Sequence, residues 1–219
     1  MSKFLIFLKS LFFPKECLDC GMLGEFICSD CLKKIPIRPS KPPEKIRYQD
    51  YLDQVHVASF YANQILAKLI DLYKFHYQEN LGTILSQIAI DYLKKNQLTA
   101  TLADFILIPL PLHRRRYLER GFNQSQIIAQ NIKQYLNAPL IDDSLIRTKY
   151  TKHQTKLNMN KRLKNISGVF SITNKQKIIG KKILLIDDVV TTGASLNEAA
   201  KILRQNGAIK VIGLVLAKN

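Results

Sequence analysis

The segment from residue 182 to residue 207 limits the fold most strongly. It begins with Lys182-Ile-Leu-Leu-Ile-Asp187, a short apolar run that predicts a strand buried on both faces, as in a parallel sheet. A turn of small residues follows, and the residues from Ala194 to Gln205 have helical spacing and end before Asn206-Gly207. A buried strand, a tight turn and a helix in this order are typical of an α/β domain.

Other apolar segments continue this alternation. We expect further strands at 55–61, 104–109, 145–146, 168–172 and 211–216, and helices at 62–77, 81–95 and 127–136. Strands that alternate with helices predict a mainly parallel sheet flanked by helices. The chain has 219 residues, which is enough for one such domain and a small additional unit.

All four cysteines lie near the start of the chain, as Cys17-Leu-Asp-Cys20 and Cys28-Ser-Asp-Cys31. Two such pairs can surround one zinc ion with four thiolates, which leaves no open position for catalysis. Two disulfides or four free thiols are the alternatives. Disulfides fit poorly in the reducing cytosol. We therefore expect structural Zn²⁺ in a small unit that has no core of its own, and a cytoplasmic location.

The apolar stretch at residues 4–13 is not expected to be a signal peptide. Lys9 interrupts it, no small-residue cleavage site follows, and Pro14 ends it, so a short amphipathic helix is the better prediction. No apolar run reaches the ~18 residues that a membrane-spanning helix needs, so an integral membrane protein is not expected.

Prolines between residues 36 and 50 mark a linker and divide the chain. We expect an N-terminal helix and zinc-binding unit in residues 1–40 and the main domain in residues 41–219. Within the main domain, residues 41–100 are the candidate hood over a site, and residues 101–219 are the core.

The charge of the chain is high and unevenly distributed. Lys and Arg number 33 against 17 Asp and Glu, a net charge of +16, and residues 113–182 alone carry 16 basic and 3 acidic residues, a net of +13. Such clustering favours an anionic partner, such as nucleic acid or a phosphorylated ligand. A solvated basic face, or a genome that favours lysine codons, is the alternative.

The turn after the 182–187 strand carries chemically useful groups, in the order Asp187-Asp188-Val-Val-Thr191-Thr192-Gly193-Ala-Ser195. Ligands of open α/β sheets bind at the carboxyl ends of strands, where these carboxylates lie. The carboxylates can accept hydrogen bonds from vicinal ribose hydroxyls, and the N–H groups of the following helix suit a phosphate. The alternative is an ordinary strand-to-helix turn with a hydroxyl cap.

This segment resembles the phosphoribosyl pyrophosphate loop of type I phosphoribosyltransferases, with Ser195 where many members have Thr. Two further segments, Ile108-Pro-Leu-Pro-Leu-His-Arg114 and Arg120-Gly-Phe-Asn-Gln124, resemble the ComF family, which includes competence proteins of natural transformation. The four cysteines and the pattern Gln154-x-x-Leu157 with Arg162-x-x-Asn165 are similar to that family as well. The resemblance covers nearly the whole chain.

The resemblance implies specific roles. Phosphoribosyl pyrophosphate would bind with Mg²⁺, and Asp187 and Asp188 would be catalytic. The residues expected to contact this ligand are Asp187, Asp188, Val189, Thr191, Thr192, Gly193, Ala194 and Ser195. The pyrophosphate loop would lie at residues 110–116, with Leu112, His113 and Arg114 nearest the pyrophosphate.

A lid over the site is expected in the segment from Arg147 to Lys164, which holds seven basic residues and no acid. The same segment could instead contact nucleic acid, with Tyr117, Phe122 and Tyr150 as stacking partners. The residues proposed for either role are Arg115, Arg116, Arg120, Lys152, Gln154, Lys156, Lys161 and Arg162. Arg115 and Arg116 could equally be solvated surface charges.

Two functions are compatible with these features. The first is a module that binds phosphoribosyl pyrophosphate and single-stranded DNA, together with proteins of DNA uptake or recombination. The second is an active phosphoribosyltransferase that acts on an unidentified base or amine. Whether the chain is an enzyme stays open, because residues 45–100 hold no readable acceptor site. A zinc-bound interaction protein with a vestigial site is disfavoured, because the Asp-Asp and Thr-Thr-Gly residues are intact.

Overall fold

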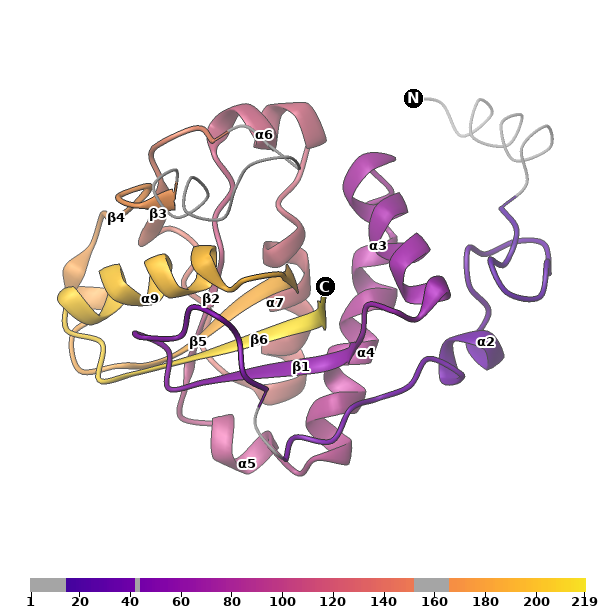
Figure 1. The fold of residues 1–219 in the computed structure, drawn as a ribbon, viewed down its shortest axis with the longest axis horizontal. Coiled ribbons are helices and arrows are strands. Elements are labelled where there is room, and N and C mark those ends of the chain that lie inside the picture. Colours follow the sequence, from indigo (N-terminus) through magenta and orange to yellow (C-terminus); the bar gives the residue numbers. More distant parts are fainter. Residues whose placement is uncertain (1–14, 42–43, 152–165) are drawn as a thin grey trace.

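A four-stranded parallel sheet forms the centre of the molecule. The computed structural model describes residues 15–41, 44–151 and 166–219. The sheet contains β1 (Gln54–Phe60), β2 (Ile106–Pro109), β5 (Lys182–Val190) and β6 (Lys210–Lys218), in the order β1-β6-β5-β2 (Figure 1). Every neighbouring pair is parallel. The predicted α/β fold with a parallel sheet is confirmed.

Helices cover both faces of this sheet. On one face α4 (Leu81–Lys95) and α7 (Gln124–Leu136) pack against the strands, and on the other face α9 (Ala194–Gln205) packs against β5 and β6. Side chains alternate along β5: Leu184 and Ile186 join the core under α4 and α7, whereas Ile183 and Leu185 join the core under α9. This explains why the strand is apolar without interruption.

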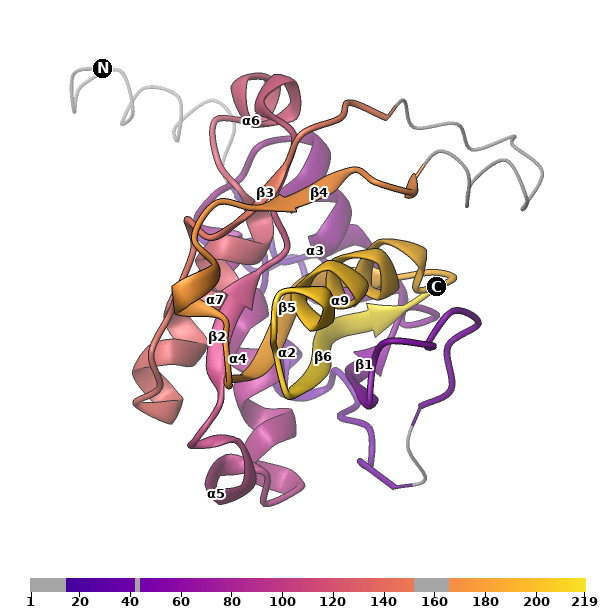
Figure 2. The same ribbon diagram turned by 90° about the vertical axis from the view of Figure 1, so that its left-hand side faces the viewer.

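The shorter elements lie around these layers. They are α2 (Ser29–Lys33), α3 (Gln64–Phe75), α5 (Thr99–Leu102), α6 (Arg114–Arg120) and the 3-10 helix η1 (Lys175–Lys177). Two further strands, β3 (Leu145–Arg147) and β4 (Phe170–Ile172), pair with each other in antiparallel fashion and form a separate ribbon. This ribbon lies near α6 and α9 (Figure 2). Strands were expected at both places, but pairing outside the central sheet could not be read from the sequence.

The segment 41–100 contributes directly to the main layers. β1 is an edge strand of the central sheet, and α4 packs on α7. α3 packs on α4 and leads from the carboxyl end of β1. The division of the chain at residues 40 and 100 stays a prediction, and both α3 and residues 46–48 of this segment contact the site described below.

The N-terminal unit shares the core of the main domain. Ile27 and Ile35 are almost fully buried and belong to the same hydrophobic cluster as Leu66 of α3 and Leu85 of α4. An isolated bridge joins Glu16 to Leu23. The unit therefore packs on the domain, although it contains few apolar residues of its own.

The expected helix at 4–13 and most of the expected lid lie outside the described residues. The same is true of Lys152, Gln154, Lys156, Lys161 and Arg162. No helix in the part of the chain that the structure describes is both long enough and apolar enough to span a membrane.

Candidate functional site

Asp187 and Asp188 lie near the carboxyl end of β5, which continues for two more residues. Oδ1 of Asp187 accepts a hydrogen bond from Ser125 Oγ of α7 at 2.9 Å and another from the Asp188 N–H at 2.9 Å. Oδ1 of Asp188 accepts one from the Val189 N–H at 2.6 Å. The two carboxylates are thus held in place by the strand itself and by the start of α7.

A lysine from α3 completes this pair, although no motif in the sequence indicated it. Lys74 Nζ lies 2.7 Å from Asp188 Oδ1, and the exposed fractions of the two side chains are only 19% and 9%. Lys74 is 114 positions away in the chain, on a helix whose spacing indicated only a buried apolar face. The contact arises because the carboxyl end of β1, which leads into α3, lies at the same edge of the sheet as the end of β5.

The electrostatic environment of Asp187 favours its protonated form. Burial is the main cause that raises the pKa of Asp187, and the neighbouring charge of Asp188 raises it further. The positive charge of Lys74 and the hydrogen bonds from the Asp188 N–H and Ser125 oppose this shift. The site is therefore prepared for a ligand that brings positive charge or hydrogen-bond donors.

The turn after β5 is closed by Gly193, which caps α9 with a φ of +85°. A Cβ at Gly193 would clash with Ile46 Cδ1 and would lie 2.9 Å from the backbone oxygen of Tyr48. The Tyr48 N–H also donates to the Thr192 backbone oxygen at 3.0 Å. Glycine is thus required here by backbone conformation and by packing against the 46–48 segment, which sequence reasoning did not anticipate.

The other residues of this turn lie together as expected. Thr191 is exposed, Thr192 and Ser195 are half-buried, and Thr192 Oγ1 accepts a hydrogen bond from the Ala194 N–H at 3.4 Å. Val189 is half-buried in β5 and Ala194 is buried at the start of α9. Their roles toward a ligand stay predictions.

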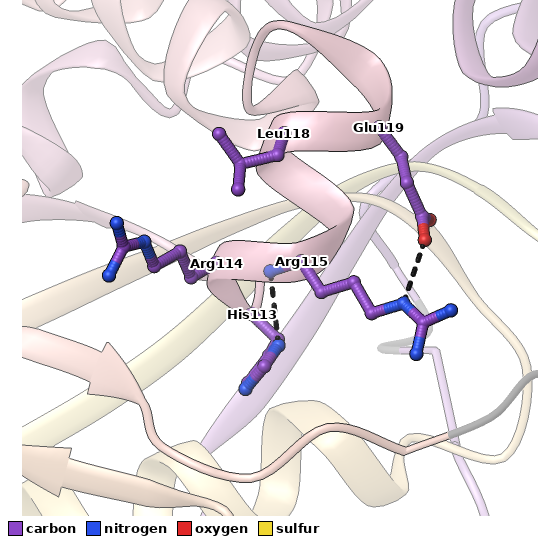
Figure 3. A pocket seen from close by; sticks show the side chains of 5 residues that line it. All are labelled: His113, Arg114, Arg115, Leu118 and Glu119. Atoms are coloured by element: carbon purple, nitrogen blue, oxygen red, sulfur yellow. Dashed lines mark hydrogen bonds and ion pairs between the residues drawn. The ribbon is translucent and has the colours of Figure 1, made fainter.

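The expected pyrophosphate loop follows β2 at the neighbouring position of the sheet. The Leu110 N–H donates to the Ile186 oxygen at 2.8 Å, so this loop begins beside the end of β5. Leu112 is half-buried, and His113 caps α6 by accepting a hydrogen bond from the Arg115 N–H at 3.2 Å. Figure 3 shows Arg114 and Arg115 pointing to opposite sides of α6. Arg114 is exposed there and lines an open cavity of about 520 Å³ with His113, Arg115, Leu118 and Glu119.

Three arginines form a second feature, the arginine cluster of Arg116, Arg120 and Arg147. Burial lowers the pKa of Arg116, and the charge of Arg120 lowers it further. Burial also lowers the pKa of Arg147, followed by the charge of Arg116, whereas Asp187 opposes that shift. None of the three forms an ion pair with a carboxylate among the described residues. The cluster is a partly buried concentration of positive charge beside the acidic pair.

Two buried hydrogen-bond donors, one in the arginine cluster and one beside it, lack an acceptor within the described ranges. They are Arg147 Nε and Gln124 Nε2. One nitrogen of each arginine has an acceptor: Arg116 donates to the Thr151 backbone oxygen at 2.8 Å, Arg147 donates to Thr151 Oγ1 at 2.6 Å, and Arg120 donates to Gln124 Oε1 at 2.9 Å. Buried donors without acceptors are costly, so the cluster suits an anion. Arg147 was expected only as the first residue of a lid.

One expected nucleic-acid contact, the ring of Phe122, needs revision, whereas Arg115, Tyr117 and Tyr150 stay predictions. Phe122 is buried, and its ring packs 5.2 Å from the ring of Tyr73, so it is not available for stacking on a base. Arg115 pairs with Glu119 at 3.1 Å and lies over the ring of Tyr150 at 4.8 Å. Tyr150 also contacts His113, with 5.4 Å between the ring centroids. Tyr117 is exposed.

The four cysteine sulfurs form a compact cluster. All four Sγ atoms lie within 4.8 Å of one another, and none is in a disulfide. The Sγ atoms of Cys20 and Cys28 are 3.8 Å apart, which equals the edge of about 3.8 Å expected for a zinc tetrahedron with Zn–S bonds of about 2.3 Å. N–H groups of Cys20, Cys28 and Asp19 lower the pKa of Cys17, whereas the hydrogen bond with the Asp19 side chain and burial raise the pKa of Cys31. The cluster can hold a metal ion.

Comparison with known proteins agrees with these features. Residues 120–219 match the model of the phosphoribosyl transferase domain. The chain is 30% identical over 211 residues to "Competence protein F" of Haemophilus influenzae, covering 92% of this chain and 84% of that protein. This chain belongs to the ComF family.

Other relatives fit that assignment. "DNA utilization protein YhgH" of Escherichia coli is 28% identical over 199 residues, which cover 89% of this ComF-family chain and 80% of YhgH. Among solved structures, a purine phosphoribosyltransferase from Pyrococcus horikoshii is 18% identical, with a TM-score of 0.39, over 61% of this chain and 73% of that chain. Because this TM-score is low, the fold assignment rests on the sheet order described above and not on this likeness.

Proposed function

We propose that this ComF-family protein binds phosphoribosyl pyrophosphate with Mg²⁺ at the carboxyl edge of its sheet, and that it acts in the uptake or recombination of DNA. The observation that carries the ligand assignment is that one oxygen of each carboxylate has no hydrogen-bond donor among the described residues. All their hydrogen bonds and the ion pair use Oδ1, so among the described residues Oδ2 of each has no donor. Two adjacent free acceptors match the two vicinal hydroxyls of a ribose.

The pyrophosphate is assigned to the arginine cluster and the loop that follows β2. Arg116 and Arg147 supply guanidinium groups that match phosphate oxygens, and the unpaired Nε of Arg147 would gain an acceptor. The 5-phosphate is assigned to the Thr191–Ser195 turn, where N–H groups at the start of α9 are available. Mg²⁺ would bind to ligand oxygens and offset the charge of the leaving pyrophosphate.

The ligand assignment predicts a clear effect of Arg147→Met. The affinity for Mg²⁺-bound phosphoribosyl pyrophosphate should fall about 10-fold or more, because a charge-assisted hydrogen bond contributes roughly 1.5–3 kcal/mol. Isothermal titration calorimetry measures this. Lys149→Met is the matched control, since this exposed lysine has the same charge two residues away. Equal losses in both variants would place the pyrophosphate elsewhere.

The cysteine cluster is assigned to one structural Zn²⁺, held by Cys17, Cys20, Cys28 and Cys31. Four thiolates satisfy its tetrahedral coordination. Support comes from the spacing of the sulfurs and from the absence of disulfides among these four residues. Thiols of this kind persist in a reducing compartment, which favours a cytoplasmic protein.

The DNA assignment is supported by relatives and by charge. The names of two relatives refer to competence and to DNA utilization. The segment 113–182 carries a net charge of +13, which suits the phosphates of a single strand. We assign the contact to the lysines of the 147–164 segment, with exposed Tyr117 as a stacking partner and with proteins of DNA uptake or recombination as further partners.

The DNA assignment predicts a specific salt dependence. Replacing Lys152, Lys156 and Lys161 by alanine should reduce the slope of log affinity against log salt by about 2, at ~0.7 per lost phosphate contact. Fluorescence anisotropy with labelled single-stranded DNA measures this slope. The exposed lysines Lys133, Lys175 and Lys181 form the matched control set. An unchanged slope in the first variant would exclude this segment as the contact.

Transfer of the phosphoribosyl group to a base or amine is the second candidate function. It is favoured by the intact Asp187–Ser195 turn together with the arginine cluster, to which the pyrophosphate is assigned. In such a reaction the C1–pyrophosphate bond breaks as an oxocarbenium-like centre forms, and the protein mainly positions the reactants. Release of pyrophosphate with a panel of bases and amines distinguishes the transferase from the binding module.

A further inference from the structure

The assignments above use the ion pair between α3 and the acidic pair only to show which carboxylate oxygens are free, and they give Lys74 no role of its own. α3 presents two residues to the site: Lys74, whose Nζ lies 2.7 Å from Asp188 Oδ1, and Tyr73. Burial raises the pKa of Tyr73, and the charge of Asp188 raises it further, so Asp188 is near both. Asp188 Oδ1 accepts a hydrogen bond from the Val189 N–H of the strand and also forms the ion pair with Lys74 of α3.

Lys74 is not needed to attach α3 to the domain. Leu66, Leu69, Ile70 and Tyr73 are all essentially buried, and they anchor this helix in the main core. The Tyr73 hydroxyl also donates to the Gln124 backbone oxygen at 3.0 Å, which ties α3 to α7. The ion pair is therefore not what holds the helix in place. It acts on the position and the charge of the carboxylates.

Three elements contribute positive charge or a hydrogen bond to the acidic pair. Lys74 of α3 and Arg147 of β3 bring positive charge, and Ser125 of α7 donates a hydrogen bond to Asp187. Lys74 is the one cation among the described residues that forms an ion pair with either acid. Without it, two adjacent carboxylates would repel each other in a partly buried site, where Coulomb interactions are stronger than in water.

We propose that Lys74 is a positioning residue of the ligand site: it fixes Oδ1 of Asp188, leaves Oδ2 for a ribose hydroxyl and offsets the negative charge of the pair. This inference rests on the proposed function, because the ligand is the one proposed above. It makes α3 part of the ribose site. It also gives the 41–100 segment a defined task, which is to set the charge of the carboxylates that receive the sugar.

The charge effect has a definite sign. Burial and Asp188 raise the pKa of Asp187, and Lys74 opposes this rise. Removing the positive charge should raise the pKa of Asp187 further. The ionised pair needed to accept two hydroxyl hydrogen bonds would then form only at higher pH.

The test compares Lys74→Met, Lys74→Arg and Lys68→Met, the last being an exposed lysine on the same helix. Affinity for Mg²⁺-bound phosphoribosyl pyrophosphate is measured by calorimetry from pH 5.5 to pH 8.5. For Lys74→Met we expect about a 10-fold loss at pH 7 and a shift of the pH profile to higher pH by about one unit. Lys74→Arg should restore the profile, and Lys68→Met should not change it. The ionisation of the ligand is common to all variants and cancels in the comparison.

A second series without ligand separates this proposal from the proposed function. The folded-state pKa of Asp187 is raised, so its ionisation costs stability as pH rises through that value. The difference in Tm between wild type and Lys74→Met should therefore grow as pH rises. A loss of affinity that does not vary with pH and is not rescued by Lys74→Arg would overturn the proposal. If the wild type does not bind the ligand, the proposed function fails, and a Tm difference that is constant with pH would overturn the charge role of Lys74 as well.

Discussion

Replacing Cys28 by serine is expected to abolish stoichiometric zinc binding and to unfold the N-terminal unit. Apparent binding free energies of structural zinc reach about 10–16 kcal/mol in zinc-finger peptides, so losing one of four thiolates removes most of what holds so small a unit together. Metal analysis of the protein purified under reducing conditions measures the zinc content. Asp30→Asn is the matched control, because Asp30 is an exposed residue of the same Cys-x-x-Cys pair.

The effect of Cys28→Ser should extend into the main domain. Ile27 and Ile35 are buried in the same hydrophobic cluster as Leu66 and Leu85, so their loss exposes part of the core under α3 and α4. Burying one such side chain contributes roughly 1.5–3 kcal/mol. Tm of the whole chain should fall in Cys28→Ser, and chelation of the metal from the wild type should lower it equally. Full zinc content in Cys28→Ser, or an unchanged Tm, would contradict this assignment.

Gly193→Ala should destabilise the protein and remove its affinity for phosphoribosyl pyrophosphate. An L-residue in the left-handed conformation costs about 1–2 kcal/mol, and the contact of the new Cβ with Ile46 and the Tyr48 oxygen adds about 1–3 kcal/mol. The turn between β5 and α9 must then shift, and with it the N–H groups assigned to the 5-phosphate. Denaturant unfolding and calorimetry measure the two effects.

Gly180→Ala is the control for backbone strain alone. Gly180 has a φ of +70°, and a Cβ there would meet no atom within 4 Å. We therefore expect Gly180→Ala to lower the free energy of unfolding by only about 1–2 kcal/mol, the cost of the left-handed conformation, and to retain ligand affinity. Its φ is close to the φ of +85° at Gly193, so the backbone strain is comparable. Equal destabilisation in the two variants would show that packing against the 46–48 segment contributes nothing.

The sequence alone was sufficient where local pattern and chemistry agree. The apolar run at 182–187 predicted a buried strand, and its extension into Asp187 and Asp188 placed both carboxylates at the carboxyl edge of a parallel sheet. The spacing of the four cysteines likewise predicted a cluster that the sulfurs form. In both cases the functional groups are close together in the chain, so their proximity needs no knowledge of the tertiary fold.

The tertiary structure decided which distant residues complete the site. Lys74 reaches Asp188 because β1 and β5 end at the same edge of the sheet, and Arg147 lies near Asp187 because β3 pairs with β4 outside that sheet. Phe122, which was expected as a stacking partner, is buried against Tyr73. Strand order and helix packing bring such residues together over long sequence separations, and local periodicity in the sequence does not predict these contacts. The sequence thus determined the fold class and the acidic and thiolate groups, whereas only the packing of α3, α6 and the β3–β4 ribbon determined the charges that surround the acidic pair.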